Sequence, residues 1–334
     1  DIIKNIEHAS GGKGVDKFYG TTGNNVLKGN NGNDVLSGKN GNDKLYGGNN
    51  NDRLYGGNGN DILDGGEGDD EIYGGDGDDI IKAGDGEDIV DAGAGNDIVY
   101  ASHGADHEDG GEGIDTFIVE DELDYVPMFD LELETVYLLG GEPGTQNSIR
   151  NFENVTIISN GSFGIKGDEN ANVLTADKGD DTVIGGAGND TLNGGAGNDI
   201  LDGGNNNDKL YGGSGNDKSY GQAGNDILYI DAGNDTLDGG SGTDWLYVTG
   251  STNSVVNLAK TTGQNTGYGT DIIKNIENAS GGKGVDKFYG TTGNNTLKGN
   301  NGNDILQGKN GNDKLYGGNN NDKLYGGSGN DKSY

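Results

Sequence analysis

The sequence contains no cysteine, and it has only three histidines and one tryptophan among 334 residues. The absence of cysteine excludes disulfide bonds and cysteine nucleophiles, and it fits a secreted protein that needs no disulfide chemistry. HExxH, GxSxG and Walker motifs are also absent, so the signatures of zinc metalloproteases, serine hydrolases and P-loop NTPases are missing. We therefore expect no enzymatic activity from these residues.

Basic residues and long apolar runs are scarce as well. The chain has 22 lysines and arginines against 56 aspartates and glutamates, which gives a formal net charge of -34. A chain this acidic is repelled by phosphate, so we do not expect nucleic acid as a partner. An anionic membrane surface is disfavoured for the same reason unless calcium bridges the two. No apolar run is long enough for a transmembrane segment.

Glycine is abundant, with 70 residues, and aspartate recurs at every ninth position in three ladders. So strict a period indicates one small unit copied many times, with the aspartate in the same role in each copy. The third ladder begins at Asp286 and pauses at Asn295 before it resumes. The candidate metal ligands in the three ladders are Asp34, Asp43, Asp52, Asp61, Asp70, Asp79, Asp88, Asp97, Asp106 and Asp115, then Asp181, Asp190, Asp199, Asp208, Asp217, Asp226, Asp235 and Asp244, and finally Asp304, Asp313, Asp322 and Asp331.

Each unit reads Gly-Gly-x-Gly-Asn/Asp-Asp-x-aliphatic-x, as in GGAGNDTLN at residues 185–193. The glycines allow positive φ, and they let backbone carbonyl oxygens turn toward a common point. Asn50 and Asn320 replace glycine in two units, and asparagine is the next most tolerant residue for this region. The second residue after each aspartate is nearly always apolar, as at Leu36 and Leu45. One inward apolar residue between outward polar ones predicts a short strand.

Nine residues then give one turn and one strand, and eighteen give a coil, so the pattern predicts an all-β fold of parallel β-rolls. Turns eighteen residues apart lie on the same side, which places Asp34 opposite Asp52 and Asp43 opposite Asp61. Two carboxylates and inward carbonyls form an oxygen cage that suits Ca²⁺ better than Mg²⁺. Candidate carbonyl ligands are those of Gly57, Gly59, Gly186, Gly188, Gly195 and Gly197.

The charge of the chain agrees with many bound cations. Pairs eighteen residues apart give eight sites in the first ladder, six in the second and two in the third, or about sixteen Ca²⁺ ions. Their charge of +32 nearly cancels -34. Without metal, the aspartates repel one another and the small core cannot offset the chain entropy. We expect the metal-free chain to be largely disordered.

A disordered low-complexity linker is the alternative interpretation of so much glycine, asparagine and aspartate. Disorder would not keep the aspartate and aliphatic positions in one common phase. We therefore reject the linker interpretation when calcium is plentiful, and we expect it to describe the chain at very low calcium.

Two segments interrupt the nine-residue period and divide the chain. Apolar runs at 117–119, 135–139 and 155–158 predict strands in the first segment, and runs at 245–248 and 255–258 predict strands in the second. We interpret both as β-rich connectors that space the rolls or cover their ends. The predicted parts are the end of a connector at 1–15, roll blocks at 16–115, 168–244 and 285–334, and connectors at 116–167 and 245–284.

A longer repeat lies above the nonapeptide. Residues 1–57 recur at 271–327 with five substitutions, and residues 204–220 recur unchanged at 318–334, an offset of 114. We expect the chain to be an excerpt from a larger tandem array of rolls and connectors.

Two groups of side chains admit a second interpretation. His103 and His107 have a spacing that suits a transition metal such as zinc, although a degenerate repeat unit explains them better. Tyrosines follow many ladder aspartates by three residues, and pairs eighteen apart should stack: Tyr55 with Tyr73, Tyr211 with Tyr229, and Tyr316 with Tyr334. Stacking on an exposed sheet face is the simpler explanation, and an aromatic strip for saccharide or for lateral contacts is the functional one.

The glycine-rich nonapeptides resemble those of the RTX, or hemolysin-type calcium-binding repeat, proteins over nearly the whole chain. The resemblance implies a bacterial protein that is exported unfolded by type I secretion and folds outside the cell when calcium becomes abundant. Together with the long repeat, it favours a structural region of a surface layer, sheath, filament or large adhesin. The alternative is the C-terminal calcium-binding module of a secreted enzyme or toxin. Besides calcium, we consider other copies of the chain and surface polysaccharide as partners.

Overall fold

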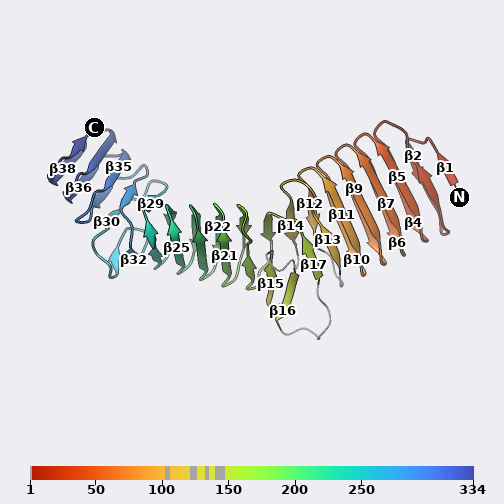
Figure 1. The fold of residues 1–334 in the computed structure, drawn as a ribbon, viewed down its shortest axis with the longest axis horizontal. Helices are drawn as coiled ribbons and strands as arrows, with labels where there is room; N and C mark the ends of the chain where they lie inside the picture. The colour runs from red at the N-terminus through yellow and green to blue at the C-terminus, as the bar shows by residue number, and fades with distance from the viewer. Residues whose placement is uncertain (1, 102–105, 121–125, 132–134, 140–146) are drawn as a thin grey trace. The chain divides into compact units, whose positions relative to one another are not determined.

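The computed structural model describes residues 2–101, 106–120, 126–131, 135–139 and 147–334, and none of these residues lies in a helix. The chain divides into two compact units, Asp1–Ser159 and Asn160–Tyr334. Each unit is a parallel β-solenoid, in which the strands of successive coils stack on one another (Figure 1). The predicted fold class, an all-β parallel roll, is confirmed.

The first unit consists of two parallel sheets, and successive strands of the chain alternate between them. One sheet contains β1 (Ile2–Lys4), β3 (Lys17–Tyr19), β5 (Val35–Asn40), β7 (Arg53–Asn58), β9 (Glu71–Asp76), β11 (Ile89–Ala94), β13 (His107–Asp109) and β17 (Asn147–Arg150). The other contains β2 (His8–Ser10), β4 (Val26–Asn31), β6 (Lys44–Asn49), β8 (Ile62–Glu67), β10 (Ile80–Asp85), β12 (Ile98–Tyr100), β14 (Thr116–Val119) and β18 (Asn154–Ile157).

The strands of the second unit alternate in the same way over β19 to β27, and beyond β27 they are shared among three sheets. One sheet contains β19 (Gly164–Lys166), β21 (Thr182–Ala187), β23 (Ile200–Asn205), β25 (Lys218–Gly224), β27 (Thr236–Asp238), β28 (Ser241–Gly242), β31 (Gln264–Asn265) and β32 (Thr270–Lys274). Opposite it are β20 (Val173–Thr175), β22 (Thr191–Ala196), β24 (Lys209–Ser214), β26 (Ile227–Ile230), β29 (Trp245–Val248), β33 (Asn278–Ser280), β35 (Thr296–Asn301), β37 (Lys314–Asn319) and β39 (Lys332–Ser333). A further sheet holds β30 (Val255–Asn257), β34 (Lys287–Tyr289), β36 (Ile305–Asn310) and β38 (Lys323–Ser328).

The register between neighbouring coils is eighteen residues, as the sequence predicts. Leu45 pairs with Leu63, and Leu63 with Ile81, so the aliphatic residue after each aspartate forms a column inside the roll. These side chains are fully buried, with an exposed fraction of 0%. Because each coil contributes few apolar residues, the core is a narrow double row, and it excludes water from the turns on either side.

The strands extend further into the glycines than the pattern predicts. β5 ends at Asn40 and β6 begins at Lys44, so only three residues separate them. In most repeats the second glycine of the Gly-Gly pair lies close to the end of a strand and has positive φ, for example 116° at Gly57. A side chain on Gly57 would collide with the carbonyl oxygen of Lys39 in the preceding coil. Lys39 and Gln222 hold the equivalent position with positive φ of 84° and 71°, so glycine is favoured there but other residues occur.

The strands predicted in the two interrupting segments are present. β14, β16 (Thr135–Leu139) and β18 occupy the first segment, and β15 (Val126–Asp130) forms an antiparallel hairpin with β16. β29 and β30 occupy the second. β14 pairs in parallel with β12 and β18, and β29 pairs in parallel with β26 and β33. Parallel pairing in one sheet thus continues through both segments.

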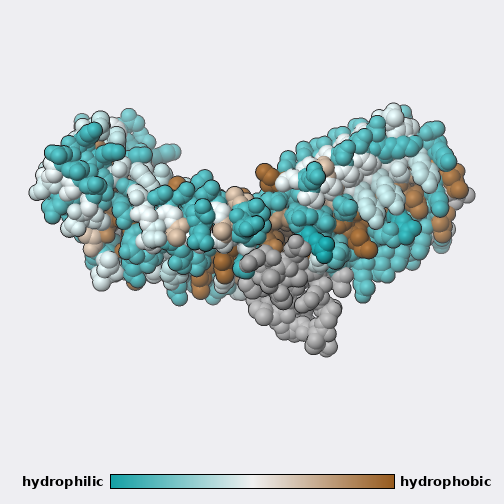
Figure 2. Space-filling view, viewed as in Figure 1, coloured by the Kyte–Doolittle hydropathy of each residue, from teal (hydrophilic) through white to brown (hydrophobic). Residues whose placement is uncertain are grey.

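The outer face of each unit is mostly hydrophilic in the view of Figure 2, with isolated hydrophobic spots. Exposed apolar side chains such as Ile89 and Ile200 stand at outward strand positions among polar residues. The described residues contain no helix, and therefore no helix long and apolar enough to cross a membrane.

Candidate calcium sites

The ladder aspartates form continuous rows along both edges of each unit. The backbone N–H of most ladder aspartates donates to the Oδ1 atom of the aspartate eighteen residues later, as from Asp34 to Asp52 at 2.7 Å and from Asp52 to Asp70 at 2.7 Å. The parallel row runs from Asp43 to Asp61 at 2.6 Å. We call each turn with its ladder residue a rung. The predicted pairing of Asp34 with Asp52, and of Asp43 with Asp61, is therefore what the structure shows.

The second carboxylate oxygen of most ladder aspartates is buried and has no hydrogen-bond partner. The exposed fraction of Asp52, Asp61 and Asp208 is 1% each. A buried carboxylate oxygen without a partner is costly unless a cation neutralises it. The unpartnered Oδ2 atoms belong to Asp34, Asp43, Asp52, Asp61, Asp70, Asp79, Asp88, Asp97, Asp115, Asp181, Asp190, Asp199, Asp208, Asp217, Asp226, Asp235, Asp244, Asp304 and Asp313. Asp106 is also buried, whereas Asp322 and Asp331 near the end of the roll are only half-buried.

Backbone carbonyls surround these oxygens. A Cβ atom placed on Gly56, the first glycine of its unit, would lie 2.5 Å from the carbonyl oxygen of Gly74 and would collide with Oδ2 of Asp61. A Cβ atom placed on Gly77 would likewise lie 2.5 Å from the carbonyl oxygen of Gly59. Alanine replaces the first glycine at Ala83 and Ala92, so a methyl group can be accommodated there with a small shift. Each rung thus presents carboxylate and carbonyl oxygens to a small water-poor space.

The glycines whose carbonyls are candidate ligands all have positive φ, and they lie in turns or near the ends of strands. The values are 116° at Gly57, 118° at Gly59, 104° at Gly186, 126° at Gly188, 95° at Gly195 and 150° at Gly197. The first glycine of each pair, such as Gly74, was missed as a donor. Gly74 does not have positive φ, so the expectation that ligand carbonyls belong to positive-φ glycines did not include it.

Burial makes these carboxylates reluctant to ionise without a cation. It raises the pKa of Asp52, Asp70 and Asp79 to about 7, and that of Asp61 and Asp190 to about 6, from an ordinary value of 3.8. In each case loss of hydration is the largest cause, and the hydrogen bond from the preceding coil opposes it. A divalent cation beside the carboxylates reverses this preference.

The donor set fits calcium. Every candidate ligand is an oxygen atom, from a carboxylate or a carbonyl, and hard cations such as Ca²⁺ take six to eight such ligands. Neighbouring coils supply two carboxylates to each space, and each interior aspartate is shared between two spaces. The buried Oδ2 atoms without hydrogen-bond partners are the observation that indicates a bound cation.

Comparison with known proteins agrees with this geometry. The model of the RTX calcium-binding nonapeptide repeat matches residues 10–45, 46–81, 82–117, 166–201, 193–228, 211–246, 220–253, 280–308 and 298–332, which together make up most of the chain. The chain belongs to the RTX calcium-binding repeat family. No curated protein matches it at a significant level.

Two solved structures resemble this RTX chain weakly. A hyperactive Ca²⁺-dependent β-helical antifreeze protein from an Antarctic bacterium is 22% identical, with 92% of this chain and 85% of that one covered and a TM-score of 0.23. The extracellular lipase LipA from Serratia marcescens is 20% identical, with 69% of this chain and 37% of that one covered and a TM-score of 0.15. Both TM-scores lie below 0.5, so neither likeness bears on what this chain does.

Five acidic residues that are not among the candidate ligands also belong to the RTX ladders, and one of them is Asp286, with which the third ladder begins. Asp16 donates its N–H to Asp34, and Asp286 to Asp304. Across the second interrupting segment, the N–H of Asp235 donates to Asp271 at 2.9 Å. Glutamates replace aspartates at the other two places: Glu153 accepts from Asp115 at 2.8 Å, and Glu277 accepts from Asp244 at 2.9 Å. The sequence carries a signal for the glutamates, because IRNFENV at 149–155 and IIKNIENA at 272–279 share an Asn-x-Glu-Asn pattern that contains Glu153 and Glu277.

Asparagine occupies the ladder position in three rungs, which we call the first rungs: those of Asn25, Asn172 and Asn295. All three side chains are buried, with exposed fractions of 1–2%. Each Oδ1 atom accepts an N–H four residues earlier, at 2.6 Å from Thr21, 3.0 Å from Asp168 and 2.7 Å from Thr291. The first rungs therefore hold an uncharged side chain where the others hold a carboxylate.

The predicted tyrosine stacks are confirmed. Ring centroids lie 5.1 Å apart for Tyr55 and Tyr73, 4.0 Å for Tyr211 and Tyr229, and 4.7 Å for Tyr316 and Tyr334. The zinc alternative has no support here: His107 is exposed in β13, and His103 lies outside the described residues.

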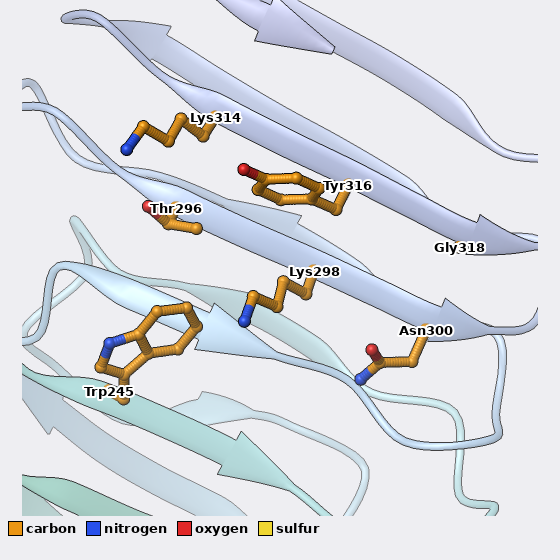
Figure 3. Close-up of a pocket in the computed structure, with 7 residues that line it drawn as sticks. All are labelled: Trp245, Thr296, Lys298, Asn300, Lys314, Tyr316 and Gly318. Carbon is orange, nitrogen blue, oxygen red and sulfur yellow. The ribbon is translucent and has the colours of Figure 1, made fainter. Parts of the chain in front are cut away.

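A groove of about 630 Å³ opens on the outer face of the second unit. Figure 3 shows its lining: Trp245, Thr296, Lys298, Asn300, Lys314, Tyr316 and Gly318. The ammonium of Lys298 lies 4.7 Å from the centroid of the Trp245 ring, within range of a cation–π interaction. The groove thus combines aromatic, amide and cationic groups on an otherwise acidic chain.

Proposed function

We propose that this chain is a calcium-binding structural region of a secreted bacterial cell-surface or extracellular protein, which folds and stiffens when Ca²⁺ binds between its coils. The observation that supports it is the row of buried, unpartnered Oδ2 atoms on both edges of each unit. Such rows leave the coils without neutralisation unless cations bind along the whole roll.

The structural part of the proposal rests on the long repeat. Residues 1–57 recur at 271–327 almost unchanged, and an extended spacer uses many copies of one unit. A surface layer, sheath, filament or large adhesin has this requirement. We propose no catalytic role for these residues, and we place the protein outside the cell, attached to a cell surface or free.

The number of ions follows from the pairs of carboxylates in neighbouring coils. Counting aspartate pairs gives about sixteen Ca²⁺ ions, and the pairs that include Asp16, Asp271 and Asp286 would add to this number. The groove beside Trp245 supports surface polysaccharide as a further partner, since saccharides bind to aromatic rings flanked by polar groups. Contacts between copies of the chain remain the second candidate.

A calcium titration tests the calcium part. Circular dichroism of the purified chain should show a cooperative gain of β-sheet signal between micromolar and millimolar free calcium, the range of extracellular sites. Native mass spectrometry at saturation should then count about sixteen ions or slightly more. Equal β-sheet content in excess chelator would refute calcium-dependent folding. Sequencing the complete gene tests the structural part. A single catalytic domain followed by one block of coils would contradict the proposal that these coils form an extended spacer.

A further inference from the structure

The turn between β26 and β27 departs from the RTX unit. Ile230 and Asp231 stand where other units have Gly-Gly, so the turn contains an additional acidic side chain five residues after the ladder residue Asp226. Ile230 is fully buried, and Asp231 is half-buried. The isoleucine fills the core position, and the aspartate is directed to the edge of the roll where the ladder carboxylates lie.

Asp231 joins two ladder aspartates in one cluster. Carboxylate oxygens of Asp217, Asp231 and Asp235 all lie within 4.8 Å of one another. The N–H of Gly213 donates to Oδ2 of Asp231 at 2.6 Å, and the N–H of Asp217 donates to Oδ1 of Asp235 at 2.9 Å. Oδ1 of Asp217 in turn accepts the N–H of Asp199 at 2.8 Å, so a backbone N–H holds each of the three carboxylates.

A second observation points to a ligand between them. The Oδ2 atoms of Asp217 and Asp235 have no hydrogen-bond partner, although the two residues are only 2% and 4% exposed. An ordinary rung brings two carboxylates to such a space, whereas this one brings three. Asp271 brings a further negative charge next to Asp235. Its Oδ1 atom accepts the N–H of Asp235, and its Oδ2 atom accepts the Thr266 hydroxyl.

We propose that Asp217, Asp231 and Asp235 form a three-carboxylate calcium site that binds its ion more tightly than the ordinary rungs. The inference rests on the proposed calcium binding and adds Asp231 as a ligand that the repeat does not supply. Affinity in oxygen-ligand sites rises with the number of charged ligands. A third carboxylate at this separation in a partly buried site should strengthen binding at least about tenfold.

Native mass spectrometry of the intact chain at stepwise lower free calcium tests this site. The wild type should retain one ion at a free calcium concentration at least about tenfold below that at which the other ions leave. Asp231→Asn should lose this last ion together with the others. Asp231→Gly restores the glycine of the ordinary unit and should behave in the same way.

Asp180→Asn is the matched control. It also removes one negative charge from the second unit, but at an exposed turn position where neighbouring units already carry asparagine, such as Asn189 and Asn198. This variant should keep the last ion. Circular dichroism at saturating calcium should give the wild-type spectrum for all three variants, which shows that each has folded.

The outcomes separate the two proposals. If the wild type binds no calcium at all, the proposed function is wrong. If it binds calcium but releases all ions together, or if Asp231→Asn retains the last ion as Asp180→Asn does, only the three-carboxylate site is overturned.

Discussion

The rungs of Asn25 and Asp61 hold the same ladder position, but they differ in charge and in backbone. Gly57 and Gly59 before Asp61 have positive φ, of 116° and 118°, whereas no residue from Gly20 to Asn25 does. The Asn25 amide accepts from Thr21 N–H, and it donates to the Thr21 hydroxyl at 3.0 Å and to the Gly23 carbonyl. Oδ2 of Asp61, in contrast, is buried without a partner. The ammonium of Lys39 lies 2.5 Å from the Gly20 carbonyl, which is the first glycine carbonyl of the Asn25 unit. The polar atoms of the Asn25 rung are satisfied by side chains of the protein, those of Asn25, Thr21 and Lys39, whereas the Asp61 rung requires an added cation.

This difference explains how one repeat can both need calcium and begin without it. A neutral amide removes the repulsion of one carboxylate, and a tethered ammonium takes a carbonyl that other rungs leave for metal. The rung of Asn25 stands at the start of a run of aspartate rungs, so the calcium-dependent coils that follow it are stacked on a coil edge that needs no ion there.

Removing calcium should have the largest effect, because it acts on every interior rung at once. Excess chelator is expected to abolish most of the β-sheet signal in far-UV circular dichroism, since the rows of carboxylates repel one another. Under partial chelation, hydrogen exchange should rise in the turns of 34–115 before it rises in the turn of Asn25. Simultaneous exchange in both places would contradict the distinction between the two kinds of rung.

Acid should partly replace calcium in the metal-free chain. Burial raises the pKa of Asp52 and Asp70 to about 7 in the folded state from 3.8, so the folded state binds more protons than the unfolded chain between these values. Without calcium, stability is therefore lowest above pH 7 and increases as the pH falls toward 4. Circular dichroism in chelator should show a gain of β-sheet signal on acidification. With calcium present, the same acidification should weaken ion binding.

A single interior aspartate should cost more than one at the end of the roll. Asp52→Ala removes a ligand from the spaces on both of its sides and should destabilise the calcium-loaded chain by about 3–5 kcal/mol. Asp331→Ala is the matched control, because Asp331 is only half-buried in the last coil. Urea unfolding at fixed free calcium measures both variants. Equal losses would show that interior aspartates are not shared between neighbouring sites.

Part of this arrangement could be predicted from the sequence, because a strict period carries it. The eighteen-residue register, the facing aspartates and the tyrosine stacks all follow from spacing alone. The continuation of the ladder at Asp271, Glu153 and Glu277 could not, since insertions of unequal length hide the register. At two of these places a glutamate holds the position that an aspartate holds elsewhere. The role of Asn25 was also missed, because asparagine is common throughout the turns.

Converting a first rung should have a moderate effect that depends on Lys39. Asn25→Asp places a carboxylate beside the Lys39 ammonium and the Gly20 carbonyl, and should cost about 1–3 kcal/mol through lost amide hydrogen bonds. It should add no bound ion, because Lys39 already occupies the carbonyl. The double variant Asn25→Asp with Lys39→Gly supplies a carboxylate and frees the Gly20 carbonyl, and it should add one Ca²⁺ in native mass spectrometry. An additional ion in the single variant would contradict the role of the ammonium.

The tyrosine stacks should have the smallest effect. Tyr55→Ala removes the ring that stacks on Tyr73 on the exposed face and should cost about 0.5–1.5 kcal/mol. The calcium titration midpoint should shift only slightly. Tyr19→Ala offers a control, because this tyrosine contacts a lysine rather than a second ring. A large change in ion number would give the stacked tyrosines a part in the metal sites.

The bond from each ladder N–H to the next carboxylate gives the roll a polarity. From Asp34 to Asp52 to Asp70, every rung donates toward one end and accepts from the other. A coil added in the reverse direction would set donor against donor or acceptor against acceptor. The roll can therefore be extended only head to tail, so any longer assembly that continues these rows must have two chemically different ends.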